Sequence, residues 1–79
     1  MITVLREGGF RIAIYLTDHL PEHVHVYGDG EAKIDLGGED GGATVVWSFG
    51  MKRGDVRRAI AIVNANRHDL IARWREIHG

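Results

Sequence analysis

Apolar and polar residues alternate through the first 49 residues, and this alternation predicts β-strands. Phe10, Ile12 and Ile14 are separated by Arg11 and Ala13, which is the period of a strand with one buried face. Gly8-Gly9 predicts a two-residue hairpin turn, which places Leu5 opposite Ile12. The same pattern predicts strands over residues 2–7, 10–16, 23–27, 32–36 and 43–49, with the glycine-rich residues 37–42 as a loop.

A second turn, Gly28-Asp29-Gly30, fixes which face each side chain of its hairpin occupies. Val24 and Val26 reach the core beside Ala32 and Ile34 only when paired residue numbers add up to 58. This register requires a three-residue turn, for which we expect a glycine in the left-handed conformation. The polar pairs on the opposite face are then His23 with Asp35, His25 with Lys33, and Tyr27 with Glu31.

The period changes after Gly50, where apolar residues recur at steps of three and four and predict helix over residues 54–78. One continuous helix of this length would be about 37 Å long and would project beyond so small a domain. We therefore expect a break near residues 64–66, with Asn66 capping the second helix. The fold class is α+β: an antiparallel β-meander of four to five strands, followed by one or two helices packed on one sheet face.

Composition limits the classes of function. With 79 residues, 44% of them hydrophobic, the chain forms a single domain over residues 1–79. There is no cysteine for disulfides, and no apolar run approaches the length of a membrane span, so we expect a cytoplasmic protein without a membrane partner. Residues 1–50 carry three basic and eight acidic side chains, whereas residues 51–79 carry seven basic and three acidic ones. The basic end is either an ordinary solvated helix face, which is the general rule for such charge runs, or a surface for an anionic partner.

His23 and His25 are the most informative residues, because side chains at i and i+2 of a strand share a face. Three interpretations remain open. Paired imidazoles beside Lys33 and Asp35 can act as acid and base in metal-independent RNA cleavage, which needs no cofactor. Alternatively, the histidines and Asp35 ligate a divalent metal, or they are polar residues on a solvated or partner-covered face.

The same face is expected to carry the residues that hold a substrate, namely Arg11, Tyr15 and Tyr27. An apolar rim is expected around them, with Val4 opposite Ala13, Ile2 beside Tyr15, and Val46 from the last strand. Trp47 and Phe49 are expected in the core beside Trp74, and the remaining histidines (His19, His68 and His78) at the surface.

Three stretches resemble a family of small bacterial proteins, the domain-of-unknown-function family four-one-six-zero. They are residues 1–11 (MITVLREGGFR), 21–26 (PEHVHV) and 66–74 (NRHDLIARW), so the resemblance covers nearly the whole chain. Family members usually begin Met-Pro-Thr and carry Pro-Pro-His-x-His. Here Ile2 and Glu22 stand in place of two prolines, whereas His23, His25 and Trp74 match.

The resemblance implies one half of a bacterial toxin and antitoxin gene pair. We therefore expect a toxin-like protein that acts on RNA through His23 and His25. Its partner would be a small protein encoded by the neighbouring gene, and the protein would form a homo-oligomer or a hetero-oligomer. The alternative is a non-catalytic module that binds protein or operator DNA.

Overall fold

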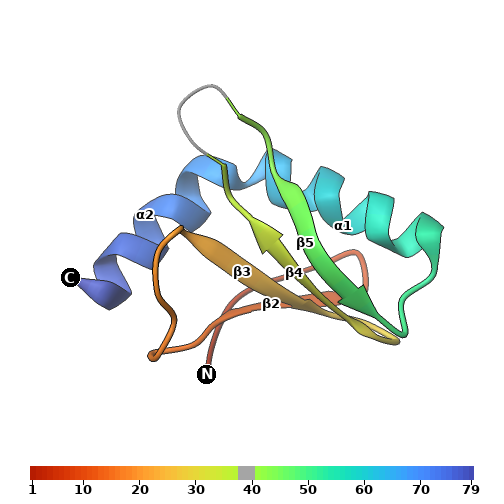
Figure 1. Ribbon diagram of the computed structural model, residues 1–79, viewed down its shortest axis with the longest axis horizontal. Helices are drawn as coiled ribbons and strands as arrows, with labels where there is room; N and C mark the ends of the chain where they lie inside the picture. The colour runs from red at the N-terminus through yellow and green to blue at the C-terminus, as the bar shows by residue number, and fades with distance from the viewer. Residues whose placement is uncertain (38–40) are drawn as a thin grey trace.

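A computed structural model describes residues 1–37 and 41–79 and shows a five-stranded antiparallel sheet followed by two helices (Figure 1). The elements are β1 (Ile2–Glu7), β2 (Phe10–Ile14), β3 (His23–Tyr27), β4 (Glu31–Asp35), β5 (Thr44–Phe49), α1 (Arg53–Ala65) and α2 (Arg67–His78). Each strand pairs with the next in the chain, so the sheet order is β1-β2-β3-β4-β5. The predicted α+β meander is confirmed. Residues 38–40 of the expected glycine-rich loop lie outside the described residues.

Both helices cover the same face of the sheet, along which they follow one another in Figure 1. The strand alternation places apolar side chains on this face, where they meet the apolar side of each helix. The buried residues contributed by the helices are Ala59, Val63, Leu70 and Trp74. Those contributed by the sheet and its connections include Phe10, Ile12, Ile14, Val24, Val26, Ala32, Ile34 and Leu36. Among the described residues, no helix is long and apolar enough to cross a membrane.

The first hairpin has the predicted turn, because Gly8 and Gly9 take φ angles of 61° and 84° and Leu5 pairs with Ile12. A register shift between Thr3 and Leu5 changes the rest of β1. Thr3 lies opposite Ala13, and Ile2 opposite Ile14. Val4 packs against the core instead of facing the histidines. The expected pairing of Val4 with Ala13, and of Ile2 with Tyr15, is therefore wrong, because a bulge inserts one unpaired residue.

The hairpin between β3 and β4 has the predicted register, with His23 opposite Asp35 and His25 opposite Lys33. The reason for its glycines differs from the prediction, since neither Gly28 nor Gly30 has a positive φ. A Cβ at Gly30 would lie 2.3 Å from the Phe49 carbonyl oxygen. Glycine is needed here because another stretch of backbone passes too close for a side chain.

A second bulge reverses the faces of β5. Lys33 pairs with Trp47, but Ile34 pairs with Val45, so Val46 is the additional residue. Beyond it, Trp47 and Phe49 lie on the face of the histidines and are 41% and 80% exposed. The prediction that they pack in the core was wrong, because strict alternation takes no account of an inserted residue. Val46 itself is 48% exposed.

The predicted break between the helices is confirmed at Asn66. Its side chain does not cap α2, contrary to the prediction. Its Nδ2 donates instead to the Ile62 carbonyl oxygen at 2.8 Å. The Ile62 carbonyl also accepts the Asn66 backbone N–H at 3.2 Å, so the side chain adds a second hydrogen bond at the end of α1.

Candidate functional site

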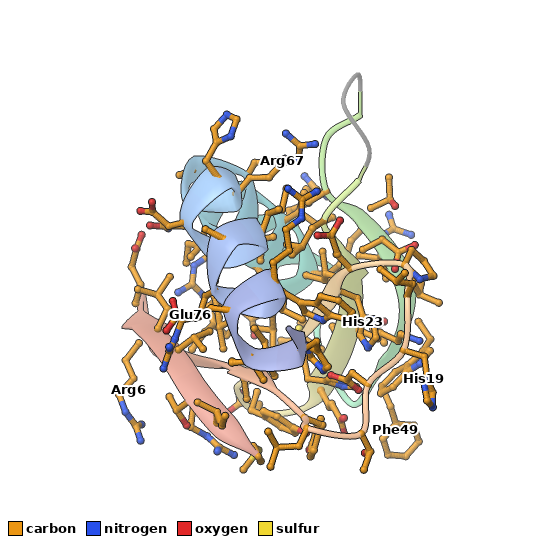
Figure 2. The ribbon with its side chains drawn as sticks, turned by 90° about the vertical axis from the view of Figure 1, so that its left-hand side faces the viewer. Arg6, His19, His23, Phe49, Arg67 and Glu76 are labelled. Carbon is orange, nitrogen blue, oxygen red and sulfur yellow. The ribbon has the colours of Figure 1, made fainter. Side chains whose placement is uncertain are left out.

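His23 and His25 lie on the sheet face opposite the valine side chains of β3, and their ring centroids are 5.4 Å apart. The site is less open than the sequence suggests, because His23 is only 4% exposed. Figure 2 views this end of the molecule, with His23 beside α2 and His19 on the outside. The connection over residues 15–22 and the end of α2 enclose His23. The histidine face is therefore covered at His23.

The acid beside the two histidines is Asp18, which comes from the connection between β2 and β3. Its Oδ1 lies 3.2 Å from His23 Nε2 and 3.6 Å from His25 Nε2. Its Oδ2 accepts a hydrogen bond from the Tyr15 backbone N–H at 2.9 Å. The carboxylate is thus held by one oxygen and presents the other to both imidazoles. We call Asp18, His23 and His25 the Asp-His-His cluster.

The orientation of His23 is fixed by its second ring nitrogen. Nδ1 donates to the Pro21 carbonyl oxygen at 2.8 Å, since a carbonyl can only accept. In the neutral ring this leaves a lone pair on Nε2, which points at Asp18 Oδ1. Two lone pairs at this separation repel, so the gap needs a proton or a metal cation between the two atoms.

His25 is enclosed by aromatic rings, with the centroids of Tyr15 and Trp47 at 4.7 and 6.2 Å. Its Nδ1 lies 3.6 Å from Glu31 Oε2. Both ring nitrogens are buried and have no hydrogen-bond partner among the described residues. Burial lowers the pKa of His25 below 6.5 and outweighs the opposing attraction of Asp18. The ring is therefore neutral at pH 7, with a lone pair free to accept a proton or a metal.

Asp18 remains ionised beside these rings. Burial alone would raise its pKa, but the Tyr15 N–H and the neighbouring His23 and His25 together lower it below the ordinary 3.8. The cluster therefore combines a carboxylate with two imidazoles in a partly buried setting, which is the type of environment that perturbs pKa values at functional sites.

The predicted catalytic residues separate into two groups. Lys33 lines the same pocket of about 350 Å³ as Asp18, His23, His25 and Trp47. Asp35 lines a neighbouring pocket with Glu22 and Thr44. Although Asp35 pairs with His23 in the register, the acid that contacts the imidazoles is Asp18.

The three predicted substrate-binding residues form one strip on the histidine face. The Arg11 guanidinium lies 4.7 Å from the centre of the Tyr27 ring. The Tyr27 hydroxyl contacts the Tyr15 hydroxyl, and the Tyr15 ring contacts His25. Burial and the Tyr15 contact raise the pKa of Tyr27 above its ordinary value, so the Tyr27 hydroxyl is neutral at pH 7.

The end of α2 supports the cluster from behind, which the sequence did not indicate for His78. This ring stacks on Trp74 with centroids 3.9 Å apart. Its Nε2 lies 3.1 Å from the Tyr15 carbonyl oxygen, so it ties α2 to the start of the 15–22 connection. Arg75 donates to Glu22 at 2.6 Å, which fixes the end of the same connection. His78 is half-buried, contrary to the expected surface position, while His19 and His68 are exposed as expected.

Family comparison covers both the cluster and the helices behind it. A family model described as Domain of unknown function (DUF4160) matches residues 9–75. The chain belongs to this family. The matched region of this DUF4160 protein contains Asp18, His23, His25 and Trp74, and the match confirms the resemblance identified from the sequence. No curated protein and no solved structure matches the chain.

Sequence reasoning missed Asp18 and Trp47 as parts of the site. A weak signal existed for Asp18, because aspartate after a strand often binds nearby backbone N–H groups and orders a turn. Nothing in the sequence shows that its second oxygen turns toward β3. Trp47 was missed because its face depends on the bulge at Val46.

Proposed function

We propose that this DUF4160 protein is the toxin-like component of a bacterial toxin-antitoxin pair and that it cleaves RNA at the Asp-His-His cluster. The observation that carries the proposal is the shared pocket, in which the cluster faces the side chains of Lys33 and Trp47. Two imidazoles, a carboxylate and an ammonium group are thereby brought together beside a space large enough for a nucleotide fragment.

These groups match the demands of RNA cleavage. The 2′-oxygen attacks the adjacent phosphorus, its proton leaves to a base, and the bond to the 5′-oxygen breaks as that oxygen gains a proton. Negative charge grows on the phosphate meanwhile, and a positive group such as Lys33 stabilises it. Trp47 offers an exposed ring on which a base can stack. Arg11, Tyr15 and Tyr27 extend the surface along the strand direction.

The surroundings of the pocket support a protein partner. Exposed apolar side chains lie on β5 and on the connection over the cluster: Val46, Trp47, Phe49, Leu16 and Leu20. β5 is an edge strand of the sheet, so its outer backbone groups are available to pair with another chain. We propose that the small protein encoded by the neighbouring gene covers this face and blocks access to the cluster.

The test combines growth and cleavage measurements. Expression of the protein should arrest bacterial growth, and co-expression of the neighbouring gene should restore it. Purified protein should cleave an RNA oligonucleotide and leave the DNA of the same sequence intact, because DNA lacks the 2′-hydroxyl. The variant His25→Gln should lose both effects, whereas His68→Gln, which changes an exposed histidine on α2, should retain them.

Retention of arrest and cleavage by His25→Gln would refute the catalytic proposal. The alternative of a non-catalytic module predicts salt-sensitive binding to operator DNA, through arginines of α1 and α2 such as Arg57 and Arg73, that survives His25→Gln. That result without RNA cleavage would favour the alternative.

A further inference from the structure

We infer that the Asp-His-His cluster is a binding site for one divalent transition-metal ion, of which Zn²⁺ is the representative. The ligands would be Asp18 Oδ1, His23 Nε2 and His25 Nε2. The inference deepens the proposed function, on whose site it rests, by assigning that site a cofactor. It departs from the metal-independent reaction favoured by the sequence and replaces Asp35 by Asp18 in the possible ligand set.

The first argument is the way in which the three ligands are held. Each ligand atom faces the centre, while the opposite atom of the same side chain is directed to a fixed group. His23 Nδ1 donates to the Pro21 carbonyl, and Asp18 Oδ2 accepts from the Tyr15 N–H. His25 Nδ1 is directed at the Glu31 carboxylate, 3.6 Å away. Metal-binding histidines characteristically have a carbonyl or carboxylate behind the non-ligating nitrogen.

The second argument is distance. Ligands at about 2.0–2.2 Å from a tetrahedral zinc ion lie about 3.3–3.6 Å from one another. The two nitrogen-to-oxygen distances are 3.2 and 3.6 Å, and all three atoms lie within 4.8 Å of each other. The two nitrogen-to-oxygen distances therefore fit a tetrahedral ion as they stand. At the widest spacing of 4.8 Å, the two imidazole nitrogens would have to approach one another by about 1.2–1.5 Å when the ion binds.

The third argument is the unsatisfied chemistry of the centre. Both Nε2 atoms point at the same carboxylate oxygen, and the two nitrogens of His25 have no hydrogen-bond partner among the described residues. Buried polar atoms without partners are rare and destabilising in folded proteins. A single cation in the centre would satisfy both Nε2 atoms and Asp18 Oδ1 together.

The ligand set also leaves a coordination position open for water or substrate. Three protein ligands, two of them histidines and one a carboxylate, are characteristic of catalytic zinc sites, which keep a further position for water or substrate. Here that position would face the pocket containing Lys33 and Trp47. Cation and ammonium would then act on the same phosphate group, which agrees with a phosphodiester substrate.

Metal binding is testable without any assay of activity. Titration of the chelator-treated protein with ZnCl₂ in a calorimeter should show one site, and CoCl₂ should give the visible absorption of tetrahedral cobalt. Asp18→Asn and His25→Gln, which keep side-chain size, should each weaken Zn²⁺ binding at least tenfold. His68→Gln should bind as the unchanged protein does. Far-ultraviolet circular dichroism establishes that each variant is folded.

The inference is overturned if Zn²⁺ does not bind to the folded protein, or if Asp18→Asn and His25→Gln bind as tightly as the unchanged chain. An equal loss in His68→Gln would also overturn it, because binding would then involve surface histidines. Specific Zn²⁺ binding without RNA cleavage would reject the proposed function alone. RNA cleavage that persists in chelator, without Zn²⁺ binding, would reject the metal site alone.

Discussion

Phenylalanine should have opposite effects on stability at the two histidines of β3. In metal-free protein, His23 Nδ1 donates to the Pro21 carbonyl and Nε2 lies at hydrogen-bond distance from Asp18. The nitrogens of His25 are also buried but have no hydrogen-bond partner among the described residues. His23→Phe thus removes interactions, whereas His25→Phe removes polar atoms that the fold does not satisfy.

The magnitudes follow from the cost of unpaired polar groups. His23→Phe leaves the Pro21 carbonyl and a buried carboxylate oxygen unpaired, which lowers the free energy of unfolding by about 2–3 kcal/mol. His25→Phe removes two unpaired buried nitrogens but also loses the weak attraction to Asp18. The net effect should be to raise the free energy of unfolding by about 1 kcal/mol. The two variants should therefore differ by at least about 3 kcal/mol, or about 12 °C in melting temperature for a domain of this size.

The measurement is urea unfolding followed by circular dichroism, in chelator, together with thermal melts. Equal destabilisation by the two substitutions would refute the reasoning, because it would show that His25 contributes a polar interaction as strong as that of His23. A stabilised His25→Phe that no longer binds Zn²⁺ would show that this histidine serves function at the expense of stability.

Two further predictions concern pH and backbone packing. The pKa values of Asp18 and His25 are lower in the folded protein than their ordinary values of 3.8 and 6.5, so the unfolded chain binds more protons in these pH ranges. The free energy of unfolding, measured in chelator, should therefore fall as the pH decreases below each ordinary value. Unfolding titrations across this range should show a flatter decline near pH 6 for His25→Phe and near pH 4 for Asp18→Asn, and parallel profiles would contradict the assignment. Gly30→Ala should destabilise the fold by more than about 1 kcal/mol, because the new Cβ would lie 2.3 Å from backbone atoms. Gly54→Ala in α1 should instead stabilise the fold by up to about 1 kcal/mol, because its Cβ meets nothing within 4 Å and alanine favours helix. Thermal melts of the two alanine variants test this, and a shift of the same sign in both would be inconsistent with it.

The sequence predicted those parts of the fold that depend on local periodicity. The alternation in β3 and β4, together with a turn of known length, was sufficient to pair His25 with Lys33. It failed at the two bulges, beside Val4 and at Val46, because one inserted residue changes every face beyond it. Whether a strand bulges depends on the packing of its neighbours, and single-strand alternation contains no information about this.

The candidate site was likewise predicted only where it depends on local spacing. His23 and His25 were found from the sequence because both lie on one strand, where spacing determines the face. Asp18 was not found, because it reaches the histidines through a turn whose path is set by tertiary contacts. Those contacts are the bond of Asp18 to the Tyr15 N–H and the contact of His78 with the Tyr15 carbonyl, across 63 positions of the chain.

The position of the cluster explains how a domain this small can bury His23 and partly bury Asp18 and His25. The cluster lies where the 15–22 connection meets β3 and the end of α2, so the last helix encloses it without adding a separate layer. Trp74 and His78 stack on one another, and His78 reaches the Tyr15 backbone whose N–H binds Asp18. The same helix therefore closes the hydrophobic core through Trp74 and positions the carboxylate through the 15–22 connection. Loss of this helix end should thus disturb the cluster and the core together, because Trp74 and His78 contribute to both.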